Sequence, residues 1–157
     1  MKSTGLDRSP THLLHRAGQG AENFFHAEMG DSELTPRQLA VLVAVAQDEG
    51  VSQTGLVEAT GIDRSTMADL VRRLHNKGLL RRRRTKEDAR AYAVKLTDEG
   101  RRVLRTAEPL AKRVDDRVLA ALPVAQRDRF IGELLTIVEA AEREAAERAA
   151  AEEGKRG

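Results

Sequence analysis

The sequence predicts a mainly α-helical protein with one small β-hairpin, and three observations lead to this fold class. Aromatic residues make up only 3% of the 157 residues and Trp is absent, so the core must consist mostly of Leu, Val, Ile and Ala, which favours helices. Apolar residues recur at intervals of three and four over most of the chain. Between residues 79 and 96 the period changes to two, which is typical of half-buried strands. We expect a single domain.

The first helix is expected from about Ser9 to His26, because the apolar residues there follow a helical period. The second helix should begin just after Thr35, which can act as its N-cap. Pro follows Thr35, at the position where a helix tolerates it best, and Gln38 completes a capping box. Leu34 and Leu39 occupy the hydrophobic-staple positions around this cap.

Two shorter helices are expected next, joined by a tight turn. Ser52 caps a helix that runs to about Thr60, Gly61 allows the turn, and Asp63 caps a third helix that ends near residue 77. Gly78 then stands where a left-handed C-cap residue belongs. This order predicts a helix-turn-helix, although ordinary packed helices also show such a pattern.

The segment LLRRRRTKEDARAYAVKL predicts the hairpin. Tyr92, Val94 and Leu96 alternate with Ala91, Ala93 and Lys95, and a polar loop at 84–90 separates this strand from the preceding one. A helix-turn-helix followed by a hairpin is a winged helix-turn-helix, which we expect over residues 34–96.

Two more helices should complete the chain. Thr97 caps a long helix, Leu122 and Pro123 end it, and a last helix is expected from about 124 to 150. Its apolar stripe contains Phe130, Ile131, Leu134, Leu135, Ile137, Val138 and Ala141. No such stripe continues beyond Glu142, so we expect fraying there and a frayed tail over residues 151–157.

Positive charge gathers in the middle of the chain. Residues 35–96 carry 12 basic and 7 acidic side chains, a net charge of +5, whereas residues 1–34 carry 3 and 5 and residues 97–157 carry 12 and 13. A basic segment between acidic flanks is the electrostatic pattern expected of a nucleic-acid binder.

The third helix has two contrasting faces. At 100° per residue, Met67, Leu70, Val71 and Leu74 lie together, and small, polar and basic residues occupy the opposite side. A helix that enters the major groove of DNA needs such a face. The candidate DNA contacts on this helix are Arg64, Ser65, Thr66, Arg72 and Arg73. An ordinary solvated face is the alternative, but the basic hairpin that follows argues against it.

The hairpin tip supplies the remaining candidates. Arg84 and Arg90 are placed to reach the DNA backbone or the minor groove, whose narrow form concentrates negative potential. Asp88 would not approach a phosphate unaided, so we expect it to pair with an arginine and to orient the loop.

These residues resemble the MarR family of bacterial transcription regulators. The resemblance is carried by LTPRQLAVL, by GIDRSTMADLVRRLHNKGLL and by the pattern D-x-R-x-x-x-V-x-L-T-x-x-G, which begins at Asp88 and ends at Gly100. It implies a homodimer held by the helices at about 9–30 and 97–150, and a pseudo-palindromic site on double-stranded DNA with half-sites about 34 Å apart. Ser52 and Gln53 match the segment with which the family contacts the DNA backbone. Repression is the family's habit.

The resemblance also implies release of DNA by a small ligand, such as an aromatic acid or an aryl-CoA thioester. The candidate effector-binding residues lie on the first helix: His12, His15, Arg16, Phe24, Phe25 and His26. Arg16 could hold a carboxylate. For the two phenylalanines, ordinary core packing is the stronger interpretation.

Other classes of function find little support. No arrangement of nucleophile and base, phosphate-binding loop or paired carboxylates indicates an enzyme, and no cofactor is expected. The absence of Cys excludes thiol sensing, and His12 and His15 lack a carboxylate to complete a metal site. The longest apolar run has 8 residues, so we expect a cytoplasmic protein with no membrane partner. A ligand-independent or architectural DNA-binding protein remains the alternative, and a winged fold used only for protein contacts is a third.

Overall fold

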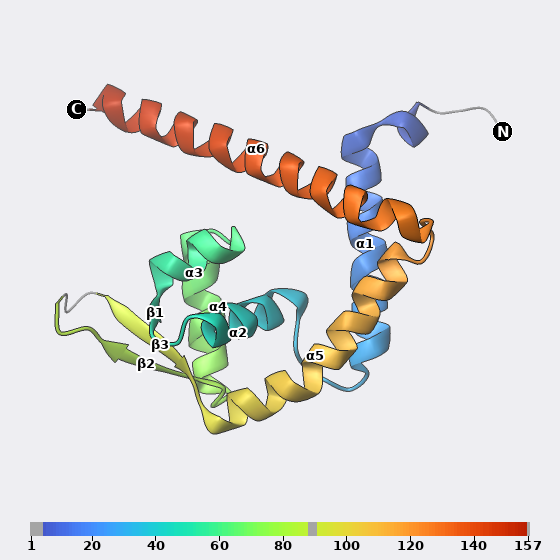
Figure 1. Ribbon diagram of the computed structural model, residues 1–157. Coiled ribbons are helices and arrows are strands. Elements are labelled where there is room, and N and C mark those ends of the chain that lie inside the picture. Colours follow the sequence, from blue (N-terminus) through green and yellow to red (C-terminus); the bar gives the residue numbers. More distant parts are fainter. Residues whose placement is uncertain (1–4, 88–90, 157) are drawn as a thin grey trace. The chain divides into compact units, whose positions relative to one another are not determined.

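In a computed structural model of the chain, residues 5–87 and 91–156 are described. The chain forms two compact units, Met1–Val118 and Leu119–Gly157. The elements, in chain order, are η1 (Leu6–Arg8), α1 (Pro10–Met29), α2 (Pro36–Gln47), β1 (Val51–Ser52), α3 (Gln53–Thr60), α4 (Arg64–Asn76), β2 (Leu80–Arg84), β3 (Tyr92–Leu96), α5 (Asp98–Leu119) and α6 (Val124–Arg156) (Figure 1). The predicted fold class is confirmed: the chain is mainly helical with a small antiparallel sheet.

The sheet has three strands, in the order β1-β3-β2, all antiparallel. The predicted hairpin consists of β2 and β3, in a register that places Leu80 opposite Leu96 and Arg84 opposite Tyr92. The strand β1 was not predicted. It pairs Val51 with Val94, but two residues are too few to show a period of two in the sequence.

Helices α2, α3 and α4 and the hairpin, here called the winged lobe, share one core. Its fully buried side chains come from every one of these elements: Val41, Leu42 and Val45 of α2, Leu56 of α3, Met67, Val71 and Leu74 of α4, and Leu80, Val94 and Leu96 of the hairpin. The predicted apolar face of α4 is therefore the buried one. Leu70, which completes that face, is 8% exposed.

The predicted helix starts are confirmed by hydrogen bonds. The hydroxyl of Thr35 accepts from the N–H of Gln38 at 3.2 Å, and the Gln38 side chain accepts from the N–H of Thr35 at 3.3 Å, which completes the capping box. Leu34 and Leu39 are both buried, as the hydrophobic staple requires. At the end of α4, Gly78 has a φ of 76°, in the left-handed region that glycine adopts without strain.

Helix α1 ends at Met29, close to the end expected near residue 30, and Met29, four residues after buried Phe25, is itself buried. One helix end differs from the prediction. Helix α6 continues to Arg156, where the sequence predicts a frayed tail. The Ala, Glu and Arg residues of this end are strong helix formers, and Arg148 pairs with Glu144 one turn away. Within the described residues, no helix is long and apolar enough to cross a membrane.

Candidate nucleic-acid interface

The first turn of α4 is fixed by Asp63. Its carboxylate accepts hydrogen bonds from the N–H and the hydroxyl of Thr66, at 2.9 Å and 2.7 Å, and from the hydroxyl of Ser65 at 2.8 Å. These three bonds lower the pKa of Asp63 from 3.8 to about 2, because each of them favours the ionised form. The hydroxyl protons of Ser65 and Thr66 therefore point toward the cap, which leaves their oxygen lone pairs as the outward-facing groups.

Two arginines on the exposed face of α4 share one carboxylate. Asp69 pairs with Arg72 three residues later, and its other oxygen accepts from Nε of Arg73 at 2.7 Å. The hydrogen bond from Arg72, followed by the charge of Arg73, holds the pKa of Asp69 below its usual range. Asp69 was not among the residues for which the sequence predicted a role. The structure shows it holding both guanidinium groups along the helix while their side chains stay more than half exposed.

Residues from β1, α3, α4 and β3 meet around a small cavity beside α4. Ser52 caps α3 by accepting from the N–H of Gly55 at 3.0 Å, and Gln53 opens the helix. Nη1 of Arg64 lies 3.4 Å from the hydroxyl of Thr54. The cavity has a volume of about 180 Å³, and its lining consists of Ser52, Gln53, Thr54, Val57, Arg64, Ala91 and Tyr92. Ser52 and Gln53, predicted from one segment, and Arg64, predicted from the third helix, are thus brought together.

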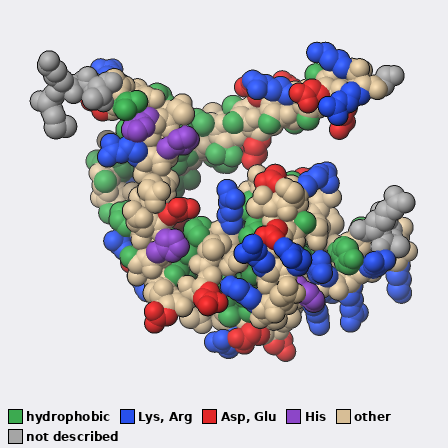
Figure 2. Space-filling model, turned by 180° about the vertical axis from the view of Figure 1, so that it is seen from behind, with side chains coloured by type: hydrophobic (Ala, Val, Ile, Leu, Met, Phe, Trp, Pro, Cys, Tyr) green, Lys and Arg blue, Asp and Glu red, His purple; other side chains and the backbone are tan. Residues whose placement is uncertain are grey.

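The wing is strongly basic over its described length. Figure 2 shows Lys and Arg side chains gathered along the hairpin, and the strand β2 is made of one Leu and four consecutive Arg. Arg84, one of the predicted contacts, ends this strand. Asp88 and Arg90 lie outside the described residues, so their predicted roles stay predictions.

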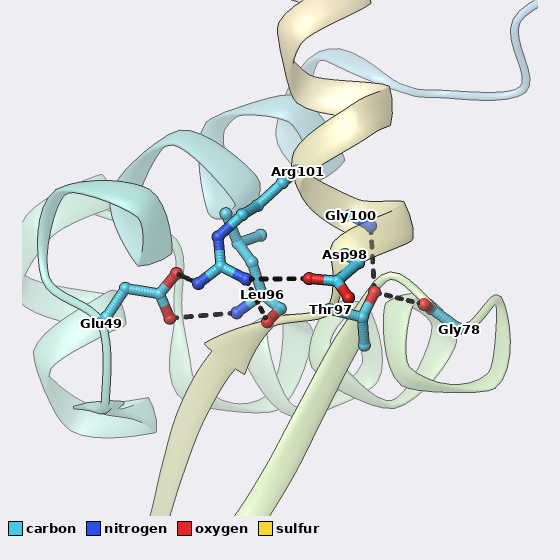
Figure 3. Close-up of polar contacts among 7 residues, drawn as sticks. All are labelled: Glu49, Gly78, Leu96, Thr97, Asp98, Gly100 and Arg101. Carbon is cyan, nitrogen blue, oxygen red and sulfur yellow. Dashed lines mark hydrogen bonds and ion pairs between the residues drawn. The ribbon is translucent and has the colours of Figure 1, made fainter.

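A polar cluster at the base of the wing ties the hairpin to α5 (Figure 3). The carboxylate of Glu49, which follows α2, accepts from the N–H of Leu96 at 3.2 Å and from Nη2 of Arg101 at 2.7 Å. The hydroxyl of Thr97 donates to the carbonyl of Gly78 at 2.6 Å. Glu49 and Arg101 were not predicted from the sequence, since nothing local relates two residues 52 positions apart.

Gly100 explains the last position of the wing pattern. A Cβ atom built at this residue would lie 2.1 Å from the carbonyl oxygen of Leu79, far inside van der Waals contact. Any side chain at this position would push α5 away from the base of the hairpin. Glycine is therefore required here for close packing and not for an unusual φ.

A second, larger cavity lies among α1, α2, α3 and α5 in the first unit. Its volume is about 580 Å³, and it is lined by Gly18, Ala21, Glu22, Phe25, Pro36, Leu39, Ala40, Val43, Ala44, Gln47, Ala59, Thr60, Ala111, Val114 and Asp115. Of the six predicted effector-binding residues, only Phe25 belongs to this lining. The contribution of α2 was missed, because its apolar residues read as ordinary core in the sequence.

The other five predicted effector residues lie elsewhere. The ring of Phe24 packs against the guanidinium of Arg117, 4.4 Å from its centroid, and Arg117 in turn pairs with Glu28. His26 meets Phe25 edge to face. His15 and Arg16 are exposed and His12 is half-buried. Among the described residues, no group of three His, Asp or Glu side chains could hold a metal ion.

Comparison with known proteins identifies the family. The model of the MarR family matches residues 32–91, which cover the winged lobe up to the start of β3. The transcriptional regulator HosA of Escherichia coli is 36% identical over 99 residues, which are 63% of this chain and 73% of HosA. The chain belongs to the MarR family. The resemblance stated from the sequence is thereby confirmed.

Solved structures of similar regulators match most of this chain. The PcaV regulator of Streptomyces coelicolor, in complex with its natural ligand, has a TM-score of 0.83 and 34% identity, over 90% of this chain and 99% of PcaV. The transcriptional repressor CouR, bound to a 23-mer DNA duplex, has a TM-score of 0.80 and 31% identity, over 88% of this chain and 98% of CouR. MarR proteins are transcriptional regulators. The residues that the family model matches, 32–91, build most of the winged lobe.

Proposed function

We propose that this MarR protein is a dimeric, sequence-specific DNA-binding repressor that a small ligand releases from double-stranded DNA. The observation that carries the proposal is the cavity at which α3, α4 and the wing meet, with Ser52, Gln53 and Arg64 in its lining. The groups expected to contact the DNA backbone, the start of α4 and the basic wing lie close together there. A duplex could engage all three at once. That CouR, which is similar to this chain, binds a DNA duplex supports a DNA-binding function.

The dimer is supported by apolar side chains that the single chain leaves exposed. Leu13 and Leu14 of α1 are 43% and 42% exposed, and Ile131, Leu135 and Val138 of α6 are 49–54% exposed. On α6 these residues follow the three-and-four spacing of one helix face. In aqueous solution, an exposed apolar helix face is usually buried against another surface. A second copy of the chain, related by two-fold symmetry, would supply such a surface.

The ligand is supported by the cavity of about 580 Å³, a size that suits a single-ring compound. The nucleotide of an aryl-CoA thioester would have to lie outside it. The lining is mostly apolar and includes the carboxylates of Glu22 and Asp115, and no Lys or Arg belongs to it among the described residues. An acidic ligand would therefore need a cation from elsewhere, and Arg16, the cation that the sequence predicts on α1, is our candidate.

The proposal is tested by selecting bound fragments from the source organism's genomic DNA and titrating the best fragment across salt concentrations. We expect a pseudo-palindromic consensus and a clear preference over random DNA. Arg64→Ala should lower the affinity, and it should reduce the slope of log affinity against log salt by about one. Arg90→Ala, predicted from the sequence alone, should do the same.

Arg143→Ala is the control, because it removes the same charge from an exposed position of α6. It should leave both the affinity and the slope unchanged. A steep salt slope without a consensus would indicate an architectural DNA-binding protein. Absence of binding at low salt would exclude DNA as the partner.

A further inference from the structure

The four arginines of β2 are divided between two faces of the wing. Successive side chains of a strand point to opposite sides, and the register places Arg82 opposite Val94 and Arg84 opposite Tyr92. Val94 is fully buried in the core of the lobe. Arg82, Arg84 and Tyr92 therefore share the face that turns toward the helices, here called the inner face. Arg81 and Arg83 lie on the outer face, where both are exposed.

Tyr92 connects the two inner arginines. The Cζ atoms of Arg82 and Arg84 lie 5.2 Å and 5.8 Å from the centroid of its ring, within the range of a cation–π contact. Tyr92 is half-buried and also lines the cavity that contains Ser52, Gln53 and Arg64. The two stacked guanidinium groups thus lie on the side of the wing that faces the start of α3 and α4.

We propose that Tyr92 is a positioning residue for DNA binding, which holds Arg82 and Arg84 on the inner face of the wing where they contact backbone phosphates. This inference rests on the proposed DNA-binding function. A guanidinium that stacks on an aromatic ring keeps its N–H donors free in the plane, where they can form paired hydrogen bonds to phosphate oxygens. Stacking also restricts two long side chains before binding, so less conformational entropy is lost when DNA arrives.

The first experiment measures affinity for the selected genomic fragment. Tyr92→Leu should weaken binding by about three- to tenfold, whereas Tyr92→Phe, which keeps the ring, should bind like the wild type. The loss should disappear when Tyr92→Leu is added to an Arg82→Ala/Arg84→Ala variant, because the residues through which Tyr92 acts are then gone. A purely structural role would lower the affinity in both backgrounds.

The strand supplies its own matched control. Arg82→Ala/Arg84→Ala should reduce the salt slope by about two, one for each lost phosphate contact. Arg81→Ala/Arg83→Ala removes the same charge from the same strand, and we expect a reduction of less than one. Equal effects of the two double variants would overturn the proposal.

The second experiment needs no DNA. Tyr92 is the only Tyr in the chain and Trp is absent, so tyrosine emission reports on this ring alone. Arg82→Ala/Arg84→Ala should make the emission more sensitive to quenching by acrylamide, because the guanidinium groups no longer cover the ring. Arg81→Ala/Arg83→Ala should leave the quenching unchanged, and the opposite pattern would show that the stack does not form.

The two experiments separate this inference from the function on which it rests. If the wild type binds its fragment and Tyr92→Leu, folded as judged by its unfolding temperature, binds equally well, the positioning role is wrong and the proposed function stands. If the wild type binds no DNA, the proposed function fails and the role of Tyr92 falls with it.

Discussion

The winged lobe and helix α6 treat their apolar side chains in opposite ways. The lobe buries side chains from each of its elements, and Leu42, Leu56 and Met67 are completely inaccessible to solvent. Helix α6 has 33 residues, about 50 Å of helix, and none of them is buried in the single chain. The lobe is thus stabilised by contacts within the chain. The apolar side chains of α6 can be buried only by another surface.

The largest expected effect comes from the core of the lobe. Leu42→Ala should lower the free energy of unfolding by about 3 kcal/mol, because it removes a buried side chain and leaves a cavity. Urea unfolding measured at several protein concentrations checks this, and the loss should not depend on concentration. Leu135→Ala is the matched change on α6, where Leu135 is 54% exposed. Leu135→Ala should lower the free energy of unfolding only at concentrations where the protein is dimeric. A loss in the monomer as large as that of Leu42→Ala would show that Leu135 is stabilised within the single chain.

The next effect concerns association. Ile131→Glu should raise the dissociation constant of the dimer by at least about tenfold, because it places a charge in the apolar stripe of α6. Sedimentation velocity over a range of concentrations measures this. Thr136→Glu adds the same charge on the opposite side of the helix and should leave the dimer intact. Wild-type protein that sediments as a monomer at every concentration would refute the dimer.

The large cavity should bind its ligand without the help of α6, because its lining lies wholly in the first unit. A ligand at 100 times its dissociation constant should stabilise that unit by about 2.7 kcal/mol, and should do so in Ile131→Glu as well. Thermal shift with 4-hydroxybenzoate and its neutral analogue 4-hydroxybenzamide provides the measurement. Arg16→Ala should abolish the shift only for the acid.

A blocking variant controls for binding elsewhere. Ala40→Phe fills the cavity from α2 and should remove the response to either compound, whereas Ala46→Phe, exposed on the same helix and outside the lining, should not. A shift that survives in Ala40→Phe would place the ligand at another site.

The smallest effect is the pH dependence of the cap on α4. Because the pKa of Asp63 is lower in the folded chain than its ordinary value of 3.8, its stabilisation is present above that pH and is lost as the pH falls through about 2. Urea unfolding of the wild type and of Asp63→Asn between pH 5 and pH 2 should therefore converge as the pH falls. A constant difference over this range would show that the carboxylate charge does not contribute.

The features that could be predicted from the sequence are local ones. The start of α2 was predictable because Thr35 and Gln38 cap it within four residues, and the two faces of α4 were predictable because its apolar positions repeat with the helical period. The family pattern extended this to the wing and the start of α5, where the close approach of Leu79 explains Gly100.

Contacts between residues far apart in the chain could be found only in the folded structure. The register of the hairpin places Arg82 and Arg84 on the same face as Tyr92, and the fold brings Glu49 to Arg101 across 52 positions. The lining of the large cavity likewise comes from helices far apart in the chain, so predicted effector residues on α1 other than Phe25 lie outside it. Caps and stripes depend on neighbours within a turn or two. Cavities and long-range ion pairs depend on how whole elements pack, which no single segment encodes.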